Sequence, residues 1–195
     1  SGPFGATYAH ALGIRPHVDR ANPILALIGS PTELTKLQSD RLESQSGVDL
    51  ITVDDPASDV SQLLSRLRAS AEIGKTVIGI RTTSRDGSAP DPLHASQMLA
   101  LIIDLAVECA DSMQFDGIYA SGGDVAFAVL DALGARGYEV ENEVVPLAVS
   151  GKLVGGPHDG LGFATKGGLV GDADAAVECI NQLRSRIRQS EPRIV

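Results

Sequence analysis

Apolar and polar residues alternate in blocks along this chain. Short runs of apolar residues, typical of strands buried on both faces, alternate with longer stretches in which apolar residues recur every three or four positions, as in amphipathic helices. The strand-like runs are 24–28, 49–53, 76–80, 117–120, 144–149 and 161–165. Helical spacing covers 32–45, 58–73, 93–113, 124–135 and 173–188. The pattern predicts an α/β domain, in which a mainly parallel sheet has helices on both faces.

Two regions depart from this alternation. No helix separates the last two strand-like runs, so we expect an antiparallel hairpin through residues 151–160, or an antiparallel edge, near the C-terminal end. Residues 1–22 lack the pattern, so we interpret them as a linker or a tail from a preceding domain, and residues 23–195 as one domain. The first residues contain neither a signal peptide nor an initiator Met. We therefore expect a cytoplasmic protein and a piece of a longer gene product.

Composition limits the classes of partner. The chain has 195 residues, of which 43% are hydrophobic and 4% aromatic, so its core must consist mainly of Ala, Val, Ile and Leu. Its 16 Lys and Arg against 25 Asp and Glu give a net charge of −9. This balance argues against nucleic acid and anionic membranes as partners, because both need a basic face. It does not exclude ATP, which can arrive with magnesium. No apolar run is long enough to predict a membrane span.

The two cysteines carry little chemistry. Cys109 and Cys179 both lie in apolar stretches of predicted helices. They have no short paired spacing, so they predict neither a zinc site nor a redox motif. We expect two buried, reduced thiols.

The first candidate for chemistry is the turn Gly122-Gly123-Asp124. It follows a strand-like run and precedes a stretch with helical spacing. Glycine lets the backbone approach a ligand, and the N–H groups at a helix start attract anions. Asp124 could cap the helix or help to hold a metal ion beside a phosphate. The alternative interpretation is a tight turn with an Asp cap and no ligand.

A second turn, which runs from Lys166 to Asp172, has the same layout. A strand-like run leads into a lysine and several glycines, and a stretch with helical spacing follows. The lysine can place its ammonium group on a phosphate while backbone N–H groups hold the phosphate oxygens. The alternative is a surface lysine beside a flexible turn. Two such turns in one α/β chain favour a shared phosphate site.

Three motifs in order resemble a known family. Gly29–Gln38 is similar to the family's Gly-Ser-x-Ser/Thr-x-x-Thr-x-x-Gln, Ser121–Ala126 to Thr-Gly-Gly-Asp-Thr-Ala, and Lys166–Gly171 to Lys-Ser-Gly-x-Phe-Gly. Over about residues 23–188, the chain resembles the C-terminal, nucleotide-binding domain of the four-carbon acid sugar kinases. It departs from the family pattern at Val125 in place of Thr, at Gly167 in place of Ser and at Val170 in place of Phe.

The resemblance implies one half of a two-domain kinase. The other, N-terminal domain would bind a sugar acid such as threonate or erythronate and supply the catalytic residues, while this domain would bind ATP with Mg²⁺. A homo-oligomer is compatible with this arrangement. The nucleotide-binding residues implied are Ser30, Thr32, Gly122, Gly123, Asp124, Val125, Lys166, Gly167, Gly168 and Gly171. Asp124 would also reach the magnesium ion.

Two other functions stay open at this point. The substitutions at Val125 and Gly167 would suit a ligand-binding or interaction module that kept the fold and lost turnover. A non-kinase α/β enzyme could also have its site at the same strand ends, because ligands of open α/β sheets gather there.

Overall fold

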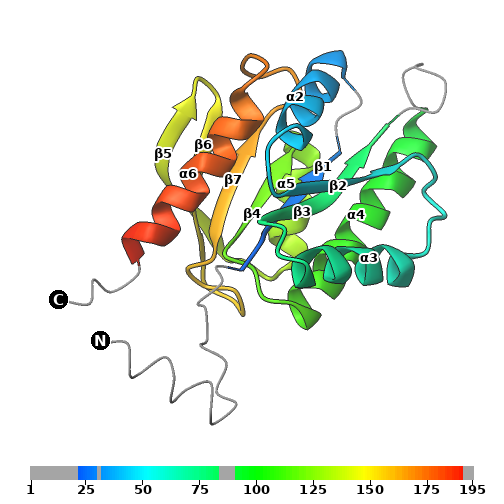
Figure 1. Cartoon of the computed structure of the whole chain (residues 1–195), viewed down its shortest axis with the longest axis horizontal. Helices are drawn as coiled ribbons and strands as arrows, with labels where there is room; N and C mark the ends of the chain where they lie inside the picture. The colour runs from blue at the N-terminus through cyan, green and yellow to red at the C-terminus, as the bar shows by residue number, and fades with distance from the viewer. Residues whose placement is uncertain (1–21, 30–31, 84–90, 191–195) are drawn as a thin grey trace, which may run out of the picture.

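The computed structural model describes residues 22–29, 32–83 and 91–190 of the chain. Its strands form one seven-stranded sheet in the order β2-β3-β1-β4-β7-β6-β5 (Figure 1). The strands are β1 (Ile24–Ile28), β2 (Val48–Val53), β3 (Val77–Thr82), β4 (Gly117–Ser121), β5 (Gly137–Val145), β6 (Ala148–Val154) and β7 (Gly162–Lys166). The helices are α2 (Glu33–Glu43), α3 (Val60–Glu72), α4 (Pro92–Ser112), α5 (Gly123–Ala132) and α6 (Ala175–Ser190). The predicted α/β class is confirmed.

Five neighbouring strands of the sheet are parallel. The pairs β2–β3, β3–β1, β1–β4 and β4–β7 all run in the same direction, so the carboxyl ends of these strands meet at one edge. From β1 the chain goes on toward β2, on one side of the sheet, whereas from β4 it goes on toward β5, on the other side. The strand order therefore reverses between β1 and β4, which is where open α/β sheets bind their ligands.

The side chains of β1 divide the core into two layers. Leu25 and Leu27 point into a cluster with residues of α3, α4 and α5. Ile24, Ala26 and Ile28 point to the other face, into a cluster with residues of α2 and α6. Because successive side chains of a strand point to opposite faces, a fully apolar strand is what a sheet covered on both faces requires.

Both cysteines lie in these two layers. Cys109 on α4 and Cys179 on α6 are buried and unpaired, as predicted. Burial raises the pKa of Cys179 to about 11 and that of Cys109 to about 12, so both thiols are protonated at neutral pH.

Helix α4 is the only described helix that meets the length and composition expected of a membrane span, with a mean hydropathy of 1.4. Core helices of soluble proteins meet the same criteria, and α4 contributes six residues from Met98 to Cys109 to the core. The prediction that no segment spans a membrane stays a prediction.

The antiparallel hairpin predicted near the C-terminal end is confirmed, because β6 and β7 pair antiparallel. The prediction of one strand over residues 144–149 is wrong. Residues 144–145 end β5 and residues 148–149 begin β6, and the two strands pair antiparallel around the turn at Pro146-Leu147, with Val145 opposite Ala148. Pro146 has no N–H for a ladder, and Leu147 has a φ of 68°, a left-handed conformation that suits a turn. Strand β5 escaped prediction because it is an edge strand with mostly exposed, polar side chains.

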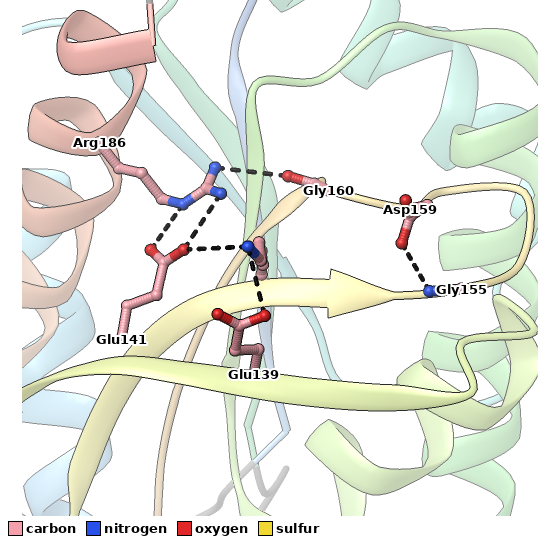
Figure 2. Close-up of polar contacts among 7 residues, drawn as sticks. Glu139, Glu141, Gly155, Asp159, Gly160 and Arg186 are labelled. Carbon is pink, nitrogen blue, oxygen red and sulfur yellow. Dashed lines mark hydrogen bonds and ion pairs between the residues drawn. The ribbon is translucent and has the colours of Figure 1, made fainter.

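An ion pair and a hydrogen bond attach this edge of the sheet to α6. Arg186 on α6 donates from Nε to the carboxylate of Glu141 on β5 at 2.8 Å, and from Nη1 to the Gly160 carbonyl at 3.4 Å (Figure 2). The hydrogen bond from Arg186 lowers the pKa of Glu141. On the same strand, Glu139 lies 3.3 Å from the Lys152 ammonium. The charges on β5 therefore also hinder pairing with another strand edge.

Candidate functional site

Backbone hydrogen bonds bring three glycine-containing turns together at the carboxyl edge of the sheet. The first turn begins at Gly29 after β1, the second is Gly122-Gly123-Asp124 after β4, and the third runs from Lys166 at the end of β7 toward α6. The Gly29 N–H, after β1, donates to the Ser121 carbonyl at 3.1 Å. The Gly122 N–H, after β4, donates to the Lys166 carbonyl at the end of β7 at 3.0 Å. Turns that are far apart in the sequence therefore lie side by side, on the three adjacent strands β1, β4 and β7. This is the geometry that a shared phosphate site requires.

The start of α5 presents free donors at this edge. Gly122 has a φ of 112°, which only glycine adopts readily, and α5 begins at the next residue. Thr32, Asp59 and Asp91 cap α2, α3 and α4 with their side chains, whereas α5 has no side-chain cap. Within the described part of the chain, the N–H groups of Gly123 and Asp124 have no acceptor. An uncapped helix start of this kind attracts anions through its donors and its dipole.

Gly123 leaves open space in front of these donors. A Cβ atom at this position would meet nothing within 4 Å, and the residue does not have a positive φ. The backbone conformation therefore does not demand glycine here. What the absent side chain provides is access to the helix start.

Asp124 places a carboxylate beside the same donors. It is exposed and lies in the first turn of α5. Among the described residues no group of three or more His, Cys, Asp or Glu side chains could hold a metal ion. Mg²⁺ is commonly held by one or two carboxylates together with phosphate oxygens and water. Asp124 fits that requirement as a single carboxylate ligand, once phosphates supply the other oxygens.

A cavity of about 210 Å³ adjoins the start of α5. Its walls come from the ends of β1 and β3, from the first half of α4 and from the first turn of α5. The lining residues are Gly29, Thr82, Thr83, His94, Ala95, Met98, Leu99, Ile102, Asp124 and Val125. It combines an apolar wall with a few polar groups, as small-molecule sites usually do.

Gly29 and Val125 pack closely together in the wall of this cavity. A Cβ atom on Gly29 would lie 2.4 Å from Cγ2 of Val125 and 2.8 Å from Cδ1 of Ile102, so only glycine fits there. Val125 is buried, with 4% of its surface exposed. Its methyl groups make this part of the wall apolar.

Lys166 is buried. The alternative interpretation, a surface lysine beside a flexible turn, is therefore wrong. Only 2% of its surface is exposed, because its side chain points to the α6 face of β7, the side of Cys179. Its ammonium donates to the Gly167 carbonyl at 3.1 Å, beneath the third turn. Burial lowers the pKa of Lys166. Lys166 therefore stabilises the turn through its hydrogen bond to the Gly167 carbonyl, and it also places a positive charge beside the turn.

The remaining predicted residues are explained by local contacts or by limited space for a side chain. Thr32 Oγ1 lies 2.8 Å from the Gly168 carbonyl, which joins the first motif to the third turn. Gly171 has a φ of 77°, and a Cβ atom there would lie 2.4 Å from that of Ala175. A Cβ atom on Gly167 would lie 3.1 Å from Cγ2 of Val170. Ser30 lies outside the described residues.

Sequence reasoning missed two parts of the site. The cavity residues on α4, His94 among them, gave no signal beyond their place near a helix start. Thr35 and Gln38 belong to the first motif, but their partners, which lie in the third turn, were not foreseen. Those partners could only be found by knowing that α2 and the third turn lie on the same face of the sheet.

Comparisons with known proteins point to one family. The profile described as nucleotide-binding C-terminal domain matches residues 25–176. A D-erythronate kinase from Heliobacterium modesticaldum is 35% identical to this chain over 95% of the chain and 47% of that protein. A D-threonate kinase from Salmonella typhimurium is 27% identical over 76% of the chain and 40% of that protein. The chain thus spans about half the length of the curated relatives it matches.

Solved structures share this fold. A domain of unknown function from Bordetella bronchiseptica, crystallised with citrate as a domain-swapped dimer, is 26% identical with a TM-score of 0.72. The match covers 84% of this chain and 41% of that one. A protein from Haemophilus influenzae, 17% identical, matches with a TM-score of 0.66 over 91% of this chain and 45% of its own. This likeness supports the α/β fold.

Proposed function

The chain belongs to the family of nucleotide-binding C-terminal domains, and from this premise we propose that it is the ATP-binding half of a kinase for a four-carbon acid sugar. Relatives named D-erythronate kinase and D-threonate kinase support this assignment. The observation that carries it is the meeting of three glycine turns around the uncapped start of α5. The chain spans only about half of those relatives. In this proposal the sugar-acid site and the catalytic base lie in the other half.

In this proposal the phosphates of ATP lie on the glycine turns. Their oxygens accept hydrogen bonds from the N–H groups of Gly123 and Asp124 at the start of α5 and from those of the Gly167-Gly168 turn. Lys166 adds a positive charge below the third turn, in partly desolvated surroundings where its attraction for phosphate is less screened than in water.

Asp124 explains why the nucleotide would bind with magnesium. A carboxylate beside a phosphate group repels it, so an ATP site with an exposed Asp at the helix start needs a cation between the two. Asp124 would hold Mg²⁺, which when bound would neutralise part of the phosphate charge. The lone carboxylate makes this a site that depends on nucleotide, because Asp124 alone supplies too few ligands.

The cavity beside α5 would receive the nucleoside. It adjoins the same helix start through Asp124 and Val125, so a nucleotide with its phosphates on the turns can reach it. Met98, Leu99 and Ile102 offer an apolar surface for the base. Polar groups such as the hydroxyls of Thr82 and Thr83 can then orient the base or the ribose.

The reaction itself needs both halves of the kinase. A hydroxyl oxygen of the sugar acid attacks the γ-phosphorus, the bond from that phosphorus to the bridging oxygen of ADP breaks, and the hydroxyl proton passes to a base of the other half. In phosphoryl transfer the protein mainly positions the groups and neutralises charge. The present chain would contribute the position and the charge balance of ATP.

Thermal unfolding with and without ligand tests the nucleotide site. A ligand that binds only the native state stabilises it by RT ln(1 + [L]/Kd), about 2.7 kcal/mol at a hundredfold excess over Kd. We expect millimolar MgATP or ADP to raise the melting temperature. Melting curves that overlay the unliganded curve would contradict a nucleotide site. A full-length protein that binds ATP but transfers no phosphate to D-erythronate or D-threonate would favour the non-catalytic module.

A further inference from the structure

Two buried polar side chains of α2 hold the backbone of the third turn. Thr35 and Gln38 are 2% and 1% exposed, although α2 packs against an apolar layer of the sheet. Thr35 Oγ1 donates to the Gly168 carbonyl at 2.9 Å. Gln38 Nε2 donates to the Val170 carbonyl at 3.0 Å and to the Asp172 carbonyl at 2.6 Å. We call these contacts the α2 clamp.

The α2 clamp binds a segment that forms neither a helix nor a strand. The third turn lies between the end of β7 at Lys166 and the start of α6 at Ala175. Within it, the Val170 N–H donates to the Gly167 carbonyl at 3.2 Å, and the Asp174 N–H donates to the Asp172 side chain at 3.0 Å. Three of its carbonyl groups are held by side chains of α2 instead. The conformation of the turn therefore depends on a helix that is more than 130 residues away in sequence.

Holding a carbonyl group also sets the direction of the next N–H group. A peptide bond is planar and trans, so its C=O and the N–H of the following residue point in opposite directions. Thr35 holds the Gly168 carbonyl together with the N-cap residue Thr32, and this contact orients the N–H of Leu169. Gln38 does the same for Gly171 by fixing the Val170 carbonyl. The contacts from α2 thus set the direction of the Leu169 and Gly171 N–H groups. Among the described residues, the N–H groups of Gly168 and Leu169 have no acceptor.

The α2 clamp leaves one buried polar atom without a hydrogen bond. Gln38 Oε1 is buried and has no hydrogen-bond partner within the described part of the chain. The amide orientation is determined by the two carbonyl groups that Nε2 contacts, so turning the amide would lose both bonds. An apolar residue at this position would avoid the unpaired oxygen. Stability of α2 alone therefore gives no reason for a glutamine here, whereas the turn does.

We propose that Thr35 and Gln38 are positioning residues of the nucleotide site, which orient the third turn for phosphate without contacting the nucleotide. This inference rests on the proposed function, because phosphate is the ligand that the turn would hold. It has a specific consequence: loss of the α2 clamp lowers the affinity for the phosphates of the nucleotide and leaves the affinity for the nucleoside unchanged.

The test compares four single variants of the chain by titration calorimetry with MgATP and with adenosine. Thr35→Val and Gln38→Met remove the α2 clamp contacts with little change in side-chain volume. Thr35→Ser restores the hydroxyl group. Ser39→Ala is the matched control, because Ser39 is 2% exposed on the same helix but donates only to the Lys36 carbonyl of that helix, at 2.9 Å.

We expect Thr35→Val and Gln38→Met to raise the Kd for MgATP about tenfold and to leave that for adenosine unchanged. Thr35→Ser and Ser39→Ala should bind as the original chain does. Hydrogen exchange at the amides of residues 168–172, without nucleotide, should be faster in the two disrupted variants alone. Should Gln38→Met not fold, Thr35→Val and its Thr35→Ser partner decide the matter.

Three results would overturn the inference. If the disrupted variants bind MgATP as tightly as the original chain, the α2 clamp is a purely structural contact, whatever its effect on the melting temperature. If they lose ATP and adenosine equally, the whole site is disturbed and positioning is refuted. Failure of the original chain to bind MgATP would instead refute the proposed function, and unchanged amide exchange would show that the α2 clamp does not hold the turn.

Discussion

Replacing Gly123 by Ala should separate nucleotide binding from stability. At this position a Cβ atom meets nothing within 4 Å, and the backbone does not have the positive φ that strains other residues. Substitution of Ala for Gly at a compatible position stabilises a protein by about 0.4–1 kcal/mol, because the unfolded chain loses freedom. Without ligand, the variant should therefore be as stable as the original chain or slightly more stable.

The same methyl group should obstruct phosphate. It would stand in the open space before the N–H groups at the start of α5, where the proposed phosphate oxygens accept. Hydrogen bonds to charged groups contribute about 1.5–3 kcal/mol, so losing one should raise the Kd for MgATP about ten- to a hundredfold. Gly123→Val, with a larger side chain, should weaken binding further. Its β-branched side chain is a poorer helix former than Ala, by less than about 0.7 kcal/mol.

Gly137→Ala provides the matched control. Gly137 is an exposed glycine without a positive φ, and the nearest atom to an added Cβ is that of Val154 at 3.9 Å. It lies at the opposite end of the hairpin from the turns, so its substitution should not change nucleotide affinity. Denaturant unfolding and calorimetric titration on the same preparations measure both quantities. A Gly123→Ala variant that loses stability and keeps its affinity would refute the reasoning, because the glycine would then serve the backbone alone.

Three further predictions concern charged groups. Burial lowers the pKa of Lys166 below its ordinary value of 10.5. At pH values between the lowered pKa and 10.5, the unfolded chain binds more protons than the folded chain, so the free energy of unfolding rises with pH. In denaturant unfolding across that window the original chain should gain stability relative to Lys166→Met, and parallel profiles would contradict this. Arg186→Ala should cost about 0.5 kcal/mol at neutral pH, since surface ion pairs contribute little. Because Arg186 lowers the pKa of Glu141, this difference should vanish as the pH falls through that pKa, and a difference that persists in acid would have another cause. Asp124→Asn should weaken the effect of magnesium on ATP affinity and leave the affinity for adenosine unchanged, whereas an equal magnesium effect in both proteins would remove Asp124 from the proposed metal site.

Local pattern was enough for the fold class and for the positions of the glycine turns. The apolar run 24–28 is buried on both faces, and a run of that kind requires covering layers on both sides wherever it occurs. The turn at Gly122 could be foreseen because the change from strand to helical spacing is visible within a few residues. Periodicity failed at β5, whose exposed, charged side chains belong to a sheet edge and follow no buried pattern.

Only the tertiary structure decided which residues meet. The sequence places Lys166 before a glycine turn, but its burial follows from the face of β7 that α6 covers. In the same way, Thr35 and Gln38 read as ordinary polar positions of a helix until strand order puts α2 beside the third turn. The physical reason is that helix and strand periods record which side of an element is buried. The identity of the neighbour on that side depends on the order of strands in the sheet, which links segments more than 130 residues apart.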